Sequence, residues 1–94
     1  MTEEIEFIAD IFGFEKQSQQ AMEELAELIQ ALSKYNRGKE NALENVIEEI
    51  ADVEIMIEQL KYLLNIKEEQ VEKIKSLKVC RTLTQIEGIK TIDF

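Results

Sequence analysis

The chain has 94 residues, of which 33% are charged, and its formal net charge is −9. Such an excess of acids opposes non-specific binding to nucleic acid and to anionic membranes, so neither is expected as a partner. The absence of histidine and the single cysteine, Cys80, exclude His–metal sites, Ser–His and Cys–His nucleophile pairs and an internal disulfide.

The length fits one small domain, which we place at residues 1–94. No apolar run has the length of a transmembrane helix, and the acidic stretch Met1-Thr2-Glu3-Glu4 lacks the basic region of a secretory signal. We therefore expect a cytoplasmic protein. A helical subunit of this size buries only about two-thirds of its unfolded surface and gains stability by burying a second face in a partner.

The chain has no proline and only three glycines, all outside the long periodic segments. This composition predicts an all-α fold. We expect a helical bundle of two long antiparallel helices, with shorter N-terminal and C-terminal helices, completed by oligomerisation.

The N-terminal residues 3–11 form a short amphipathic pattern that ends near Gly13. Three aromatic residues, Phe7, Phe12 and Phe14, cluster around this end. We expect them mainly in the core, with a contact to a ligand base as the alternative for one of them.

The first long helix is predicted at residues 15–35 and the second at residues 40–64. At roughly 100° per residue, each has a wide apolar arc. Glu24 lies on the flank of the first arc and Glu27 just beyond its edge. Glu49 falls near the middle of the second arc, with Asp52 on its edge. The two arcs consist of Ala21, Leu25, Leu28, Ile29 and Leu32, and of Val46, Ile50, Val53, Met56, Ile57, Leu60, Leu63 and Leu64.

A weaker apolar stripe follows the other side of the second long helix. It contains Ile47, Ala51, Ile55 and Tyr62. A helix that is apolar nearly all round is buried on both sides, so this stripe is predicted to be a subunit interface.

A third helix is predicted to begin near Ile66 or Lys67, and Arg81 lies on the same side as Ile74 and Leu77. Arg81 either extends its charged end to solvent or meets a phosphate group in an acidic pocket. The tail at residues 84–94 has a more β-like pattern and is predicted to be extended.

If the two long helices pair antiparallel, Glu24, Glu27, Glu49 and Asp52 converge. An unpaired carboxylate on an apolar arc is costly, and clustered carboxylates are the ligands that hard divalent cations prefer. A metal–phosphate site, with a phosphate ester or anhydride as substrate, is the functional interpretation. The structural alternative is a pair of ordinary acidic helices whose glutamates face solvent.

The motifs Glu23-Glu24-Leu25-Ala26-Glu27 and Glu49-Ile50-Ala51-Asp52, separated by a helix end, a turn and a helix start, resemble the signature of the MazG-like all-α nucleoside triphosphate pyrophosphohydrolases. The resemblance covers about residues 17–81. It implies a homodimer or homotetramer that binds Mg²⁺, or Mn²⁺ in its place, through Glu24, Glu27, Glu49 and Asp52.

The resemblance also implies cleavage of an NTP or dNTP between the α- and β-phosphates, which yields the nucleoside monophosphate and pyrophosphate. Glu24 or Glu27 would orient or deprotonate the attacking water. Family members carry basic and amide residues on the next helix, where this chain has Lys73, Lys78 and Arg81, but Leu77 stands where an asparagine is expected. We further assign Gln17 and Gln20 to contacts with the nucleotide.

Two alternatives lie outside this activity. A non-enzymatic helical interaction module would use the apolar stripes to bind a partner helix and would not respond to Mg²⁺. A degenerate family member would bind a nucleotide without hydrolysing it.

Overall fold

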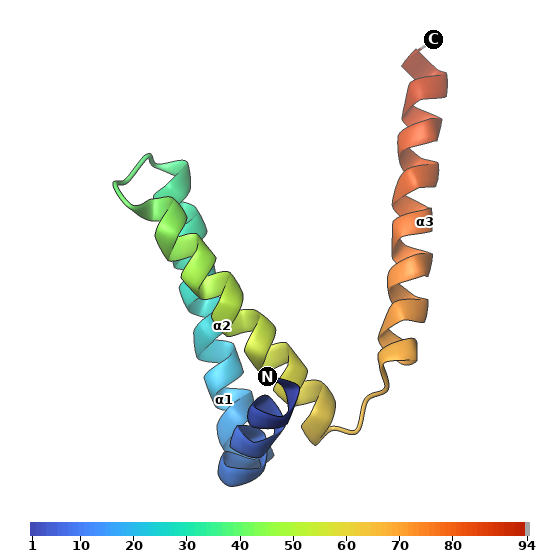
Figure 1. Ribbon diagram of the computed structural model, residues 1–94. Helices are drawn as coiled ribbons and strands as arrows, with labels where there is room; N and C mark the ends of the chain where they lie inside the picture. The colour runs from blue at the N-terminus through green and yellow to red at the C-terminus, as the bar shows by residue number, and fades with distance from the viewer. Residues whose placement is uncertain (94) are drawn as a thin grey trace.

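The computed structural model describes the backbone of residues 1–93 and the side chains of residues 1–88. Three helices, α1 (Thr2–Asn36), α2 (Ala42–Leu63) and α3 (Glu68–Asp93), account for nearly all of this part of the chain, and no strand occurs in it. The predicted all-α class is confirmed. Figure 1 shows α1 and α2 side by side as an antiparallel hairpin, with α3 standing apart from them.

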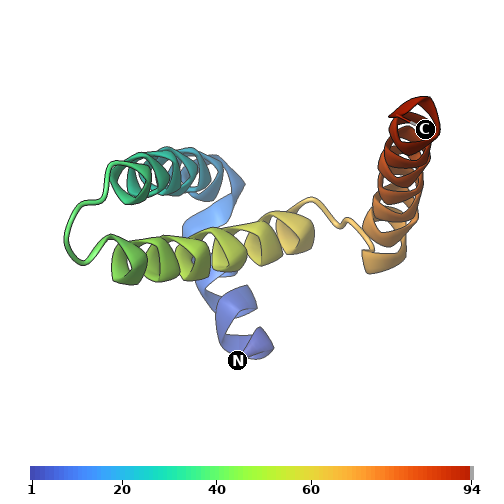
Figure 2. The ribbon, with the colours of Figure 1, turned by 90° about the horizontal axis from the view of Figure 1, so that it is seen from above.

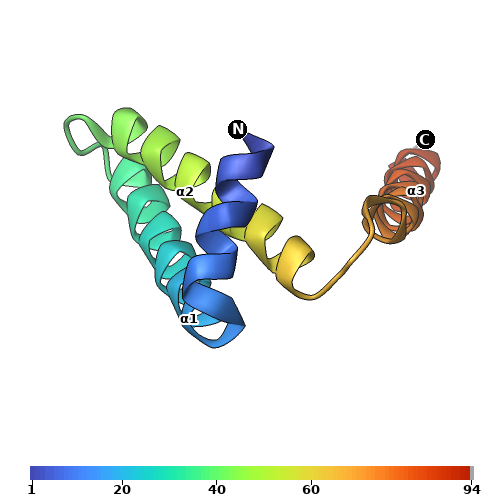
Figure 3. The ribbon, with the colours of Figure 1, turned by 60° about the horizontal axis from the view of Figure 1, so that its bottom comes forward.

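The sequence-predicted break near Gly13 is present as a sharp kink within α1. Gly13 has φ 82° and ψ 168°, a left-handed backbone that glycine adopts without steric cost. The kink turns residues 2–12, which we call the N-terminal arm, across α2, as Figures 2 and 3 show. The arm therefore packs on the second helix rather than extending the first.

A short loop at residues 37–41 reverses the chain between the two hairpin helices. Gly38 (φ 71°) and Asn41 (φ 58°) adopt the left-handed conformation that ends and starts helices at such turns. A short helix–helix connection makes the helices antiparallel neighbours. The expected pairing of the two long helices is thereby confirmed.

The hairpin core consists mainly of small side chains, including Ala21, Ala31, Val46 and Val53. Only part of each predicted apolar arc is buried, because a helix that packs against one neighbour covers only one side of its surface. Ile29, for example, is 69% exposed although it belongs to the first arc.

Two buried amides fasten the N-terminal arm to the hairpin. Gln59, only 1% exposed, donates from Nε2 to the Ile5 carbonyl oxygen at 3.1 Å and accepts at Oε1 from Gln17 Nε2 at 2.7 Å. Near the end of the arm, the Tyr62 hydroxyl donates to Asp10 Oδ2 at 2.8 Å. A satisfied buried polar network of this kind fixes one arrangement of the packed elements.

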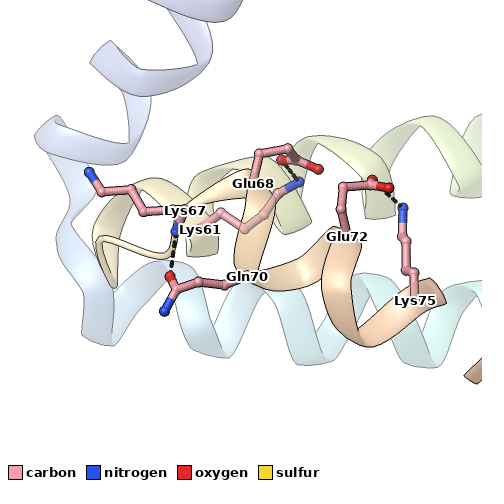
Figure 4. Close-up of polar contacts among 6 residues, drawn as sticks. All are labelled: Lys61, Lys67, Glu68, Gln70, Glu72 and Lys75. Atoms are coloured by element: carbon pink, nitrogen blue, oxygen red, sulfur yellow. Dashed lines mark hydrogen bonds and ion pairs between the residues drawn. The ribbon is translucent and has the colours of Figure 1, made fainter. Parts of the chain in front are cut away.

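Near its first turn the third helix is joined to the hairpin by an ion pair, in which Lys61 Nζ lies 2.8 Å from Glu68 Oε2 (Figure 4). The Lys67 amide donates to Gln70 Oε1 at 2.8 Å, which satisfies one backbone donor next to the helix start. Further along, Lys75 Nζ pairs with Glu72 Oε1 at 3.5 Å. These are exposed contacts that contribute little to stability.

The extended tail predicted at residues 84–94 is not observed, because α3 continues to Asp93. An isolated extended segment would leave its backbone groups without partners from another strand, whereas a helix pairs them internally. Phe94 lies outside the described residues. Among the described residues, none of the helices combines the length and hydrophobicity needed to span a membrane.

Candidate metal centre

The four acids singled out in the sequence come together in the middle of the hairpin. One carboxylate oxygen from each of Glu24, Glu27, Glu49 and Asp52 lies within 4.8 Å of the other three. Each helix supplies two acids three residues apart, which places them on one face. The antiparallel pairing then brings the two faces together.

The register of the hairpin determines which acids face each other. The hydrogen bond between Gln17 and Gln59 fixes one pair of opposing positions. In an antiparallel pair of helices, the numbers of two opposing residues have the same sum at every level. Glu24, seven residues after Gln17, therefore faces Asp52. One helical turn further along α1, Glu27 faces Glu49. The buried amides therefore fix the alignment of the acids as well as the position of the N-terminal arm.

Two of the four acids, Glu49 and Asp52, have raised pKa values. Partial burial raises the pKa of Glu49, and Glu27, Asp52 and Glu24 raise it further through their negative charges and a hydrogen bond shared with Glu27. Burial likewise raises the pKa of Asp52, together with the charge of Glu24 and a hydrogen bond shared with it. Glu49 and Asp52 therefore retain their protons more strongly than isolated carboxyls do.

Two carboxylate oxygens in the cluster are buried without a hydrogen-bond partner, Glu24 Oε2 and Glu49 Oε2. The other oxygen of Glu24 accepts from Gln20 Nε2 at 2.8 Å. Among the ion pairs of the described residues, none involves the four acids. A buried, unpaired anionic oxygen is costly, and a cation bound between the helices would remove that cost.

The donor set fits a hard divalent cation. All the potential ligands are carboxylate oxygens. Hard cations such as Mg²⁺ and Mn²⁺ prefer oxygen ligands, whereas softer metals prefer sulfur and nitrogen ligands. Four acids on two rigid helices also hold more negative charge than one divalent ion neutralises. The four acids could therefore hold a metal ion between the two helices.

The two glutamines assigned to nucleotide contacts lie in different environments. Gln20 lies beside the acids and is bonded to Glu24. Gln17 is 6% exposed and its amide nitrogen is bonded to Gln59. Gln20 is therefore the amide available next to the centre, while Gln17 supports the packing of the hairpin.

The basic residues assigned to phosphate binding, Lys73, Lys78 and Arg81, lie on the exposed surface of α3. Since α3 stands apart from the hairpin (Figure 1), the chain does not bring these residues to the four acids. Within one chain, the centre contains acids without the basic side chains that the resemblance places next to them.

The aromatic residues near the kink are at the surface rather than in the core. Phe7 is 64% exposed, Phe12 49% and Phe14 46%. The arm buries Ile5 and Ala9 instead, so its aromatic side is left outward. Lys16 Nζ lies 5.0 Å from the centre of the Phe12 ring, a cation–π contact.

Sequence reasoning missed Gln59, which aligns the hairpin and holds the arm. Its position was a usable signal, because Gln59 falls on the helical side shared by Met56 and Leu63. A polar residue on such a side requires a buried partner.

The chain was also compared with other proteins. Known protein families, curated proteins and solved structures yield no match to it. The function of the chain must therefore be inferred from the acidic centre itself.

Proposed function

We propose that this protein is a Mg²⁺-dependent nucleoside triphosphate pyrophosphohydrolase, which cleaves an NTP or dNTP between the α- and β-phosphates. The observation that supports the proposal is the convergence of four carboxylates, two of which have buried oxygens without partners. Acids in this arrangement are costly without a cation, and a cation held by carboxylates is suited to binding phosphate groups.

Glu24, Glu27, Glu49 and Asp52 hold the metal in this proposal, and Mn²⁺ can replace Mg²⁺ there. A bound divalent ion supplies Lewis-acid activation of the phosphate and lowers the pKa of a coordinated water. Glu24 or Glu27 accepts the proton of the attacking water, because both come from the motif whose counterpart has that role in the resembling family. Gln20 holds Glu24 in orientation through its hydrogen bond.

The direct test is pyrophosphate release from a panel of NTPs and dNTPs with Mg²⁺. The expected products are pyrophosphate and the nucleoside monophosphate in equal amounts, and chelation of the metal should stop the reaction. The absence of turnover across the panel, with a folded and metal-loaded protein, would reject the activity.

A second candidate function is a helical interaction module without catalysis. Its support is the number of large apolar side chains at the surface, such as Ile29 and Leu77, which are 69% and 58% exposed. An interaction module has no use for the four converging acids. It predicts that Mg²⁺ leaves the melting temperature unchanged, whereas a metal site raises it by mass action.

A protein that binds nucleotide without hydrolysing it would respond to Mg²⁺ but release no pyrophosphate. Binding of a non-hydrolysable NTP analogue in the presence of Mg²⁺ would identify it. The replacement of the expected asparagine by Leu77 is the feature that favours this outcome over full activity.

A further inference from the structure

The third helix stands apart from the hairpin, and its large apolar side chains lie at the surface (Figure 1). A lone helix in water has marginal stability, because most of the stability of a protein helix comes from the packing of its apolar side. α3 therefore requires a surface that covers it. Its exposed apolar residues in the described part of the chain are Ile74, Leu77, Val79, Leu83 and Ile86, which are 50%, 58%, 58%, 55% and 43% exposed.

Apolar residues recur at every third position of α3, at Val71, Ile74, Leu77, Cys80, Leu83 and Ile86. Residues three apart form one of the ridges with which helices pack into each other's grooves. At roughly 100° per residue, the row turns by about 60° at each step, so Ile74, Leu77 and Cys80 span about a third of the circumference. An arc of this width can contact two neighbouring helices at once.

The hairpin has an uncovered apolar side, which we call the hairpin face. Relative to the buried side of α1, Leu25 and Ile29 turn one way around the helix and Glu27 turns the other way. On α2, Ile50 turns away from Asp52 in the same manner. Because the helices are antiparallel, the face lies on one common side, opposite to the four acids. It consists of Leu25, Ile29 and Leu32 on α1, which are 47%, 69% and 46% exposed, and of Ile50 and Ile57 on α2, which are 43% and 46% exposed.

The connection between α2 and α3 sets the register in which these two helices can pack. It consists of residues 64–67, and connections of this length join antiparallel neighbours in helical bundles. The numbers of the flanking residues, Leu63 and Glu68, sum to 131, and opposing residues of an antiparallel pair keep that sum. Ile74 is then opposite Ile57, and Cys80 is next to the level of Ile50. The apolar positions of α3 and of the hairpin face therefore coincide.

The charges agree with the same register. Lys73 is opposite Glu58, and Lys78 is next to the level of Glu54. Both glutamates are exposed, and among the ion pairs of the described residues neither has a partner. The two helices thus have complementary charges beside their matching apolar positions.

We propose that α3 closes onto the hairpin face of its own chain and forms a three-helix bundle, which is the main arrangement in dilute solution. The short connection holds α3 beside this face at an effective concentration on the order of millimolar, which exceeds that of a free partner in such a solution. The hinge lies at residues 64–67, where Asn65 (φ 55°) adopts a left-handed conformation that asparagine tolerates.

Closure on this side leaves the metal centre open, because the four acids lie on the other side of the hairpin. It also gives Leu77 a role in packing, at the position where the resemblance expects an asparagine. Opening of the hinge exposes both apolar surfaces together, as in Figure 1. The hinge therefore controls whether these surfaces are accessible to another molecule.

The first test uses the single cysteine of the chain, Cys80, which is exposed on α3. Ile50→Cys adds a second thiol on the hairpin face, and Glu48→Cys adds one on the opposite side of α2 as the control. A short bismaleimide, added at low protein concentration, should link the two thiols of Ile50→Cys within one chain and should leave those of Glu48→Cys unlinked. Peptide mass spectrometry and a denaturing gel identify the link. A link between two chains, equal linkage in the control, or no link in Ile50→Cys would overturn the proposal.

The second test measures the environment of the hairpin face. The chain contains no tryptophan, so Ile29→Trp introduces a single emitter there. Its emission should be blue-shifted at every protein concentration and should shift to the red when Leu77→Glu is added. Ser76→Glu, at an exposed position outside the row, is the control and should leave the emission unchanged.

A red emission from Ile29→Trp alone would show that the hairpin face is uncovered, and a blue shift that grows with protein concentration would show that a second copy covers it. Either result would reject closure, as would an emission that Leu77→Glu leaves unchanged. Neither test involves metal or nucleotide, so their failure is separate from failure of the hydrolase proposal.

Discussion

The α1–α2 hairpin and α3 differ in how their functional residues are placed. The hairpin fixes four acids within one small volume through its register, its short loop and the amide pair Gln17–Gln59. The third helix has 26 residues, and the ion pair that joins it to the hairpin lies at its first turn. One chain therefore brings the four acids together, whereas it does not bring the basic residues of α3 to them.

Charge sharpens this contrast. The stretch from Lys73 to Arg81 contains four basic residues and no acid, in a chain whose net charge is −9. Such a basic stretch attracts acidic surfaces when association brings the two close together.

The largest expected effect is that of Glu49→Gln on catalysis. This substitution removes a charged metal ligand and keeps the shape of the side chain. We expect pyrophosphate release to fall by about 10³-fold, or ~4 kcal/mol of transition-state stabilisation. The metal-free protein should remain at least as stable as wild type, because a poorly solvated charge has been removed.

Glu48→Gln is the matched control for this substitution, because Glu48 is the adjacent exposed acid and lies outside the cluster. It should retain wild-type activity and wild-type stability. A metal-free Glu49→Gln protein that is strongly destabilised would show that Glu49 belongs to a structural network instead.

The next largest effect is expected at Gln59. Gln59→Ala leaves the Ile5 carbonyl and the Gln17 amide without their buried partner and opens a cavity. We expect a loss of about 2–3 kcal/mol in the free energy of unfolding, measured by urea denaturation. Gln30→Ala, at an exposed position of α1, is the control and should change stability little.

The same two regions show how far the sequence alone predicts the structure. The all-α class, the break at Gly13 and the convergence of the four acids follow from periodicity and from the spacing of acids relative to apolar arcs. These features depend on local geometry, which helical angles describe well. The N-terminal arm crossing α2 does not follow, since it depends on which carbonyl the Gln59 amide reaches.

The burial of individual apolar residues was harder to predict. The helical periodicity assigns Ala21 and Ile29 to the same apolar arc, yet Ala21 is 3% exposed and Ile29 is 69% exposed. The difference arises because the arc is wider than the strip that one neighbouring helix covers, and small residues allow close helix approach. Periodicity identifies an apolar arc but does not say whether the same chain or a partner covers each half of it.

The third prediction concerns Mg²⁺ and the melting temperature. If the four acids hold the ion, Mg²⁺ at ten times its dissociation constant should stabilise the folded protein by about 1.4 kcal/mol. For a domain of this size such a gain raises the melting temperature by several degrees. Hydrogen exchange should slow in α1 and α2 and remain unchanged in α3.

Glu49→Gln should remove most of this stabilisation, while Glu48→Gln should preserve it. Slower exchange in α3 upon addition of Mg²⁺ alone would contradict the contrast between the two regions, because it would show that the ion also orders the third helix. No shift at any concentration of Mg²⁺ would favour the interaction module.

The smallest expected effect is the pH dependence of stability in the absence of metal. Glu49 and Asp52 have folded-state pKa values raised above the ordinary 4.5 and 3.8. Each binds protons more tightly in the folded state, so its stabilising contribution is complete below the ordinary pKa and is lost as the pH rises through the raised value. The melting temperature of the metal-free protein should therefore fall as the pH rises above 4.5. The melting temperature of Glu49→Gln should fall less over the same pH range. The difference between the curves of wild type and Glu49→Gln separates the effect of this site from the general repulsion within a chain of net charge −9.

Saturating Mg²⁺ should reverse the pH dependence of the wild-type melting temperature, because the ion binds the ionised carboxylates and its affinity rises with pH. If the melting temperatures of wild type and Glu49→Gln changed in parallel with pH, Glu49 would not have a raised pKa. The four acids would then be ordinary solvent-exposed residues on two helices.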